Sequence, residues 1–171
     1  MTLMARQQDP TRTQHCPVLV LGLGNLLLRD EGVGVHVAQA MQAMELPNGV
    51  EVVDGATAGL DLLDIVASRR RVIVIDAIEG ECLPGTVVRL TPGDLAPRDD
   101  ALVSLHGLGL VEALSLCGRL GLAPGDVVIF GVKPAKVEYG LELSTELNRL
   151  LPRIVDLVLG EIEGCEREDQ S

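Results

Sequence analysis

Short unbroken apolar runs alternate with helically spaced apolar residues along this chain. The run Val18–Leu23 stops at Gly24, as a buried strand of a parallel sheet does. From Glu31 onward apolar residues recur at helical spacing until Pro47 interrupts them. The cycle then repeats and predicts strands at 50–53, 72–75, 86–90 and 127–130, with helices at 59–67, at 105–120 and from Ser144 onward.

Strands that alternate with helices predict an α/β fold. We expect a three-layer α/β/α sandwich around a mostly parallel, mixed sheet of five or six strands. One domain is expected over residues 17–160, with Pro152 kinking or dividing its last helix. Residues 1–16 are predicted to be a disordered tail, and the acidic residues 161–171 a solvated, frayed one.

Composition narrows the possible partners. Acidic side chains (25) outnumber basic ones (14), and the net charge of -11 would repel phosphate backbones. Only 1% of the residues are aromatic, which leaves little for base stacking, so nucleic acid is not an expected partner. No apolar run reaches the roughly 18 residues of a membrane helix, and no membrane insertion is expected.

The predicted location is cytoplasmic. The first sixteen residues are polar and lack the apolar core of a signal peptide. The four cysteines are scattered without a CxxC pair, so free thiols in a reducing compartment fit better than a zinc site or a redox motif.

Polar residues that follow strand ends are the first candidates for chemistry, because ligands of open α/β sheets bind beyond the carboxyl ends of the strands. Four places qualify: residues 25–31, Asp54 with Gly55, Asp76, and residues 133–138.

The first of these places has glycines typical of a phosphate loop, at Gly22 and Gly24. However, the third glycine of a dinucleotide fingerprint and the Lys-Ser/Thr of a P-loop are absent. Asp30 and Glu31 would also repel phosphate, so nucleotide binding is disfavoured.

Three residues supply a possible metal site. Singly, Glu31 is explained by helix capping, Asp76 equally well as a turn residue or a ligand, and His106 as a core or capping group. Together they offer two carboxylates and one imidazole, a set suited to nickel or zinc that can leave coordination positions open. Such an open site suits metal-assisted hydrolysis.

Other catalytic arrangements lack support. His36 has no acidic neighbour in sequence and is interpreted as surface or structural. No GxSxG nucleophile elbow occurs, and Cys82 and Cys117 have no setting that suggests a thiol protease.

Five motifs follow one another in order along the chain. They are Gly22-Leu23-Gly24-Asn25 with Asp30-Glu31-Gly32 and Gly34, then Asp54-Gly55-Ala56-Thr57-Ala58-Gly59, then Asp76-Ala77, then Ser104-Leu105-His106, and finally Gly131-Val132-Lys133-Pro134 with Leu143-Ser144. In this order they resemble the motifs of the hydrogenase maturation proteases. The resemblance extends over about residues 18–160.

The resemblance implies a role for each motif. Glu31, Asp76 and His106 occupy the metal-binding and catalytic positions of that family, and Asp54 with Gly55, together with Asn25, falls where substrate is recognised. The implied partner is the precursor of the [NiFe]-hydrogenase large subunit, from which a C-terminal extension is removed. Nickel would be supplied by this substrate, and no permanently bound cofactor is expected.

The role of nickel stays open at this point. Two carboxylates and an imidazole could complete the coordination of a partly liganded ion, which would make the metal a checkpoint for docking. The metal could also polarise the scissile carbonyl or activate water. Alternatively, Asp76 or Glu31 could act as a general base for water.

The sequence departs from the family pattern at three positions. Ala56 replaces a glycine, which bears on local backbone freedom. Lys133 and Ala135 stand where Glu or Gln and an acidic residue are usual, which bears on the choice of precursor.

Two other functions compete with this one. A non-catalytic nickel or assembly factor would use the same residues without cutting. A peptidyl-tRNA hydrolase shares the GLGN strand end, with His36 near the expected spacing. Leu26 and Leu27 depart from its pattern, and an acidic chain is poorly suited to tRNA.

Overall fold

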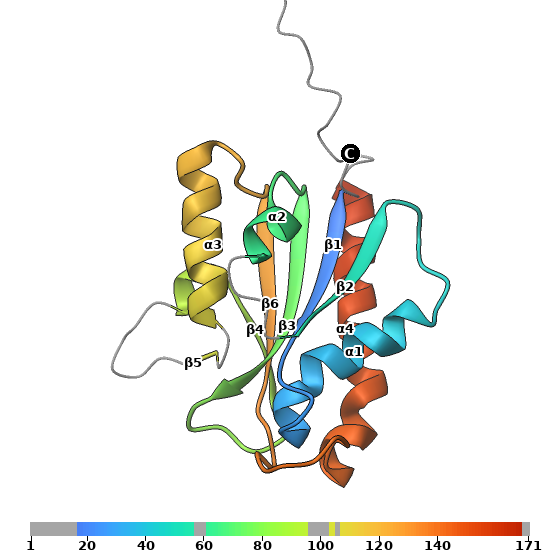
Figure 1. Ribbon diagram of the computed structural model, residues 1–171. Coiled ribbons are helices and arrows are strands. Elements are labelled where there is room, and N and C mark those ends of the chain that lie inside the picture. Colours follow the sequence, from blue (N-terminus) through green and yellow to red (C-terminus); the bar gives the residue numbers. More distant parts are fainter. Residues whose placement is uncertain (1–16, 57–60, 96–102, 105–106, 169–171) are drawn as a thin grey trace, which may run out of the picture.

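The computed structural model describes residues 17–56, 61–95, 103–104 and 107–168 (Figure 1). Its strands are β1 (Val18–Leu23), β2 (Val50–Ala56), β3 (Arg71–Glu79), β4 (Val87–Leu90), β5 (Val103–Ser104) and β6 (Asp126–Val132). Its helices are α1 (Val33–Gln42), α2 (Leu62–Val66), α3 (Gly107–Leu120) and α4 (Thr145–Glu168), with 3-10 turns η1 (Arg29–Gly32) and η2 (Pro92–Leu95).

The strands in the described part of the chain form one mixed sheet of six strands. Its order is β2-β1-β3-β6-β4, and β5 adds a short antiparallel pairing to the end of β3. β2, β1, β3 and β6 are parallel, whereas β4 runs antiparallel to β6. Helices α1 and α4 cover one face of the sheet and α2 and α3 the other (Figure 1). The predicted three-layer α/β/α sandwich is confirmed.

Alternation along the strands builds two separate cores. In β1, Val18 and Val20 pack toward α1 and α4, whereas Leu19 and Leu21 join the core beneath α2 and α3. All four side chains are buried, because both faces of a parallel sheet are covered by helices. The continuous apolar runs seen in the sequence follow from this double burial.

The C-terminal part of the chain differs from the prediction. The frayed tail predicted from residue 161 is wrong over residues 161–168, because α4 continues to Glu168. Ile162 and Cys165 prolong its apolar stripe and are buried against the sheet. Pro152 lies inside α4 without dividing it. Residues 169–171, like the predicted N-terminal tail at 1–16, lie outside the described residues.

The remaining differences are small. β3 extends four residues beyond the predicted Ile75 and so includes Asp76, and β5 was not predicted because two residues carry no periodicity. None of the helices in the described part of the chain is long and apolar enough to span a membrane.

Candidate functional site

The candidate site lies where the parallel strands end, at the lower end of the molecule in Figure 1. α1 begins directly against the ends of two neighbouring strands. A Cβ atom on Gly34 would collide with the carbonyl oxygens of Leu23 in β1 and Ile75 in β3. Only glycine therefore lets the first turn of α1 approach the sheet closely enough to bring η1 over the strand ends.

Glu31 is positioned by η1 at this edge. Gly24, which follows β1 with a φ of +145°, packs against the backbone carbonyl of Glu31, and η1 contacts β3. The Glu31 side chain is half-buried. Its Oε2 atom is inaccessible to solvent and has no hydrogen-bond partner among the described residues. A buried carboxylate oxygen without a partner is costly, so it marks a position where a ligand can be accommodated.

Asp76 is fully buried near the end of β3. It follows Val72 and Val74 and precedes Ile78 on the face of the sheet that α2 and α3 cover, so it is the acidic member of an otherwise apolar row. Its Oδ1 atom accepts a 2.8 Å hydrogen bond from the backbone N–H of Ala77. Glu31 lies in η1, which leads into α1 on the other face of the sheet. Asp76 and Glu31 are therefore at the same edge of the sheet but belong to opposite faces.

His106 lies outside the described residues. The chain on either side of it is placed: Ser104 in β5 pairs with Ile78 in β3, two residues beyond Asp76, and α3 begins at Gly107. Among the residues that the structure describes, no group of three or more His, Cys, Asp or Glu side chains could hold a metal ion. The described part of the predicted metal set is therefore Glu31 and Asp76.

The predicted substrate-binding residues occupy the ends of β1 and β2. Asp54 is exposed; its Oδ1 accepts from the Ala56 N–H at 3.0 Å and its Oδ2 from Gln39 Nε2 at 3.3 Å. Gly55 is buried beneath Leu21 and Leu23.

Asn25 is half-exposed. Its Oδ1 accepts from the Leu27 N–H at 3.0 Å, a bond that shapes the turn after β1. Of the three predicted substrate-binding residues, Asp54 therefore presents the most accessible polar group.

Ala56, which replaces a glycine of the family motif, has a backbone conformation that glycine adopts more easily. Its φ is +41°, in the left-handed region that disfavours residues with a Cβ atom. The Ala56 carbonyl accepts a 3.0 Å hydrogen bond from Gly24 N–H, which ties the end of β2 to the end of β1. The strain is therefore located beside the candidate site.

Asp30 has a role that the sequence did not indicate. It is fully buried, and its carboxylate accepts three backbone hydrogen bonds, from Ala135 (2.9 Å), Lys136 (2.8 Å) and Ser144 (2.6 Å). The helix whose N-cap Asp30 binds is α4, which begins more than one hundred residues away along the chain. Ser144 is itself the N-cap of α4, since its Oγ accepts a hydrogen bond from Leu147 N–H.

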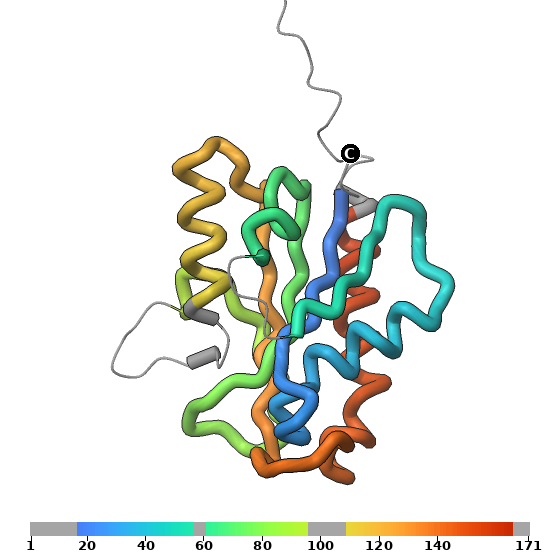
Figure 2. The backbone as a smooth tube through the Cα atoms, viewed as in Figure 1, coloured from blue at the N-terminus to red at the C-terminus, as the bar shows by residue number. Residues whose placement is uncertain are grey.

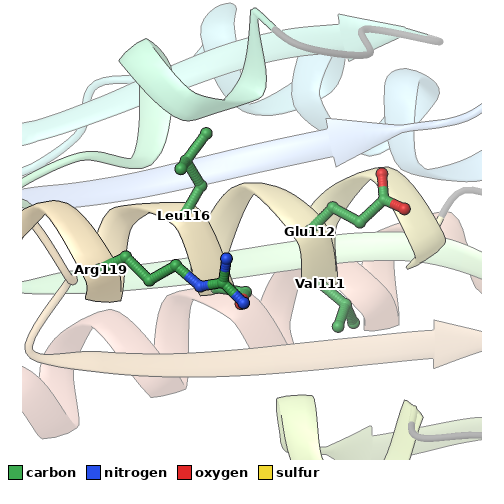
Figure 3. Close-up of a pocket in the computed structure, with 5 residues that line it drawn as sticks. Val111, Glu112, Leu116 and Arg119 are labelled. Carbon is green, nitrogen blue, oxygen red and sulfur yellow. The ribbon is translucent and has the colours of Figure 1, made fainter.

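A shallow depression of about 360 Å³ lies elsewhere, along one side of α3 (Figure 3). It is lined by Val111, Glu112, Ser115, Leu116 and Arg119. None of the predicted site residues is among these five. The depression is open to solvent, whereas the carboxylates of the candidate site are buried at the strand ends.

Two of the three residues considered for other kinds of catalysis, His36 and Cys117, lie in helices that pack against the sheet. His36 is half-buried in α1. Burial raises the pKa of the Cys117 thiol, and the carboxylate of Asp64 raises this pKa further. A thiol with a raised pKa is mostly protonated near neutral pH and is a poor nucleophile, which agrees with the absence of a thiol-protease motif.

Solved structures define the class to which this fold corresponds. A structure of the hydrogenase maturating endopeptidase HybD from Escherichia coli is 33% identical and has a TM-score of 0.78, covering 86% of this chain and 93% of that chain. The [NiFe] hydrogenase maturation protease HybD from Thermococcus kodakarensis is 26% identical with a TM-score of 0.68, covering 82% and 95%. The class is that of the hydrogenase maturating endopeptidases.

Sequence comparisons give the same result. Residues 35–161 match the model of the hydrogenase maturation protease family. The hydrogenase 2 maturation protease of Escherichia coli K12 is 35% identical over 144 residues, which cover 83% of this chain and 88% of that protein. The chain belongs to the hydrogenase maturation protease family and is a hydrolase of the endopeptidase type. The resemblance drawn from the five motifs is confirmed.

Proposed function

We propose that this protein removes the C-terminal extension of a [NiFe]-hydrogenase large-subunit precursor, and that it recognises nickel already held by that substrate. The observation that carries the proposal is the pair Glu31 and Asp76 at one edge of the sheet. Glu31 keeps a buried Oε2 atom without a hydrogen-bond partner among the described residues, and Asp76 is fully buried. Carboxylate oxygens in this setting can bind a cation that a docking substrate supplies.

His106 is proposed as the third ligand. It follows β5, which is paired to the end of β3, and precedes α3. A carboxylate–carboxylate–imidazole set is borderline in softness and suits nickel, and it leaves coordination positions for the ligands of the precursor. Nickel would then be part of the substrate, and the protein would need no cofactor of its own.

The chemistry of the cut has two possible sources in these residues. Hydrolysis requires water to add to the scissile carbonyl and a proton to reach the leaving amine. Either nickel in the substrate polarises the carbonyl or the water, or a carboxylate of Glu31 or Asp76 takes the proton from water. In the first case the two carboxylates bind the metal, whereas in the second at least one of them must remain unliganded.

Other features bear on the cellular location and on the competing functions. The three described cysteines, Cys82, Cys117 and Cys165, are free thiols, which agrees with a role in the cytoplasm. The net charge of -11 disfavours the tRNA hydrolase alternative. The non-catalytic assembly factor is the alternative that needs a direct assay, because it would use the same ligands.

The test compares nickel-loaded with nickel-free precursor, each incubated with the purified protein and followed by mass spectrometry. Loss of a C-terminal peptide only from the nickel-loaded form is expected, with no cleavage by Glu31→Gln or His106→Ala. Asp54→Asn serves as the comparison variant for substrate recognition, and it should weaken binding more than the cleavage step.

The outcomes separate the alternatives. Stable binding of the nickel-loaded precursor without a cut would favour the assembly factor. Cleavage at equal rates with and without nickel would refute the metal checkpoint. Variants of Glu31 that still bind the nickel-loaded precursor but do not cut it would favour the general-base mechanism.

A further inference from the structure

Exposed apolar side chains are concentrated at the same end of the molecule as Glu31 and Asp76. Nine large apolar residues are exposed in the described part of the chain. Four of them lie on α3, on α4 or beyond the end of α1. The other five lie in loops that follow the carboxyl ends of β1, β3 and β6, and they are Leu27, Leu83, Val137, Tyr139 and Leu141.

Two of these loops are joined into one unit. Gly140 forms a parallel bridge with Leu28, donates its N–H to the Leu27 carbonyl at 3.0 Å, and accepts from the Arg29 N–H at 2.9 Å. Arg29 Nε also contacts the Glu138 carboxylate at 3.1 Å. The loop after β1 and the loop after β6 therefore run side by side (Figure 2). Their fixed geometry lowers the entropy cost of binding a partner.

The exposed side chains of this unit form what we call the apolar loop surface, defined as Leu27, Val137, Tyr139 and Leu141. Tyr139 is the only tyrosine of the chain and is 89% exposed. Leu27 (60%) and Leu141 (66%) are also largely solvent-accessible. Exposed apolar patches of this kind mark interaction sites, and tyrosine is enriched among residues that dominate binding energy.

The apolar loop surface is continuous with the candidate site. Leu27 is four residues before Glu31 in the same loop, and the Asp30 carboxylate holds the backbone of Ala135 and Lys136 in the facing loop. An endopeptidase has to bind a protein at its site, so a surface that adjoins the site lies within reach of that protein.

We propose that the apolar loop surface is the docking surface for the folded body of the precursor, next to the C-terminal extension. The proposal rests on the proposed function. Nickel coordination by Glu31, Asp76 and His106 reports that the metal is present, but two carboxylates and an imidazole would bind nickel in many protein contexts. Contacts with an apolar patch on the precursor supply the selectivity for this substrate.

Charge agrees with a protein occupant of this kind. Both lysines of the chain, Lys133 and Lys136, lie in the loop after β6, although the chain as a whole carries a net charge of -11. The same loop carries Glu138 and Glu142, so the formal charges of residues 133–144 cancel. A precursor surface with an apolar centre and a rim of mixed charge is complementary to it.

The experiment measures cleavage of the nickel-loaded precursor by Tyr139→Ala and, independently, by Leu27→Ser from the other loop. Initial rates over a range of precursor concentrations give kcat and KM, and thermal melts check folding. We expect kcat/KM to fall about tenfold or more for Tyr139→Ala, through KM, with kcat nearly unchanged. Leu120→Ser is the matched control, because Leu120 is 57% exposed at the far end of α3.

Each possible result either supports or overturns the role of the apolar loop surface in docking. Unchanged kcat/KM in both variants, an equal fall in Leu120→Ser, or a fall in kcat with KM unchanged would overturn the docking surface. If Tyr139→Ala melts early, Leu27→Ser carries the same test from the other loop. If the wild-type protein does not cut the nickel-loaded precursor at all, the proposed function fails. If both variants cut it at the normal rate, the docking proposal alone fails.

Discussion

The two ends of the central sheet treat their charged residues differently. At the amino end, charges are paired: Arg71 meets Asp126 at 2.7 Å, and Arg89 meets Glu161 at 2.9 Å. At the carboxyl end, Glu31 keeps a buried oxygen that has no hydrogen-bond partner in the described part of the chain. Other charges at the carboxyl end are paired, Arg29 with Glu138 and Asp30 with backbone amides, but this Glu31 oxygen remains available to a ligand.

The pKa values reflect the pairing at the amino end. The hydrogen bond from Arg89 holds the pKa of Glu161 below its usual range, although burial opposes this shift. Burial also tends to lower the pKa of Arg71, but the hydrogen bond with Asp126 and nearby negative charge outweigh it and raise that pKa. Both shifts stabilise the charged forms, as expected for groups whose role is to hold α4 and the strands together.

The comparison predicts that substitution of Asp76 at the carboxyl end lowers activity with little loss of stability, whereas substitution of Glu161 at the amino end lowers stability and leaves activity unchanged. The largest effect is expected for Asp76→Asn, which should lower the rate of precursor cleavage by at least about one hundredfold because a neutral amide is a poor ligand and no base. The asparagine oxygen can still accept the bond from Ala77 N–H, so the melting temperature should change little. Glu161→Gln is the control and should cut at the wild-type rate. An Asp76→Asn variant with more than half the wild-type rate would show that this carboxylate is not needed for cleavage.

Asp30→Ala should give the largest loss of stability at the carboxyl end. The substitution leaves the amides of Ala135, Lys136 and Ser144 without their acceptor, at a cost of about 3 kcal/mol or more in the free energy of unfolding. Urea denaturation measures this difference. Asp54→Ala is the matched control, because Asp54 is exposed, and it should cost about 1 kcal/mol or less. A loss below about 1 kcal/mol for Asp30→Ala would show that the two loops do not depend on this carboxylate.

Glu161→Gln should destabilise the protein in a pH-dependent way. Because the folded-state pKa of Glu161 is lowered, its contribution is fully present above the ordinary glutamate pKa of about 4.3 and is lost as the pH falls through the lower folded-state value. We expect a loss of about 1 kcal/mol at pH 7, a modest value because Arg89 is half-exposed. Unfolding measured at a series of pH values should show the two proteins converging in acid. A difference that persists unchanged at low pH would mean that the effect is not due to the charge.

The smallest expected effect is a gain. Ala56→Gly should stabilise the protein by about 0.5 kcal/mol, because relief of the left-handed strain slightly exceeds the entropy that glycine adds to the unfolded chain. Ala40→Gly, within α1, is the control and should cost about 1 kcal/mol. Thermal unfolding compares the pair. A loss of stability in Ala56→Gly would show that the backbone at this position relaxes in the presence of alanine.

Much of the fold could be predicted because strands buried on both faces of the sheet consist of continuous apolar residues. The run Val18–Leu23 coincides with β1, since every residue in it is buried. The end of α4 was missed because its acidic residues dominate the local composition. Ile162 and Cys165 continue the spacing of Ile154, Val155 and Val158, and this spacing, rather than the charge, decides that the helix persists.

Only part of the candidate site could be predicted from the sequence. Glu31 and Asp76 follow apolar strands, so their arrival at one edge follows from parallel pairing. The role of Asp30 was not predictable, because its three partners are 105 to 114 residues away. Local sequence explains an acidic residue near a helix start as a cap, and only the tertiary structure shows which helix it caps.

The link made by Asp30 has a consequence for protein engineering. The segment between β6 and α4 is attached to the opposite loop mainly through backbone amides, whose positions do not depend on side-chain identity. Its exposed residues can therefore be exchanged as a cassette between relatives, provided that the aspartate and the lengths of both loops are kept. Under the docking proposal, such chimaeras would carry the precursor preference of the donor while retaining the cleavage machinery of the recipient.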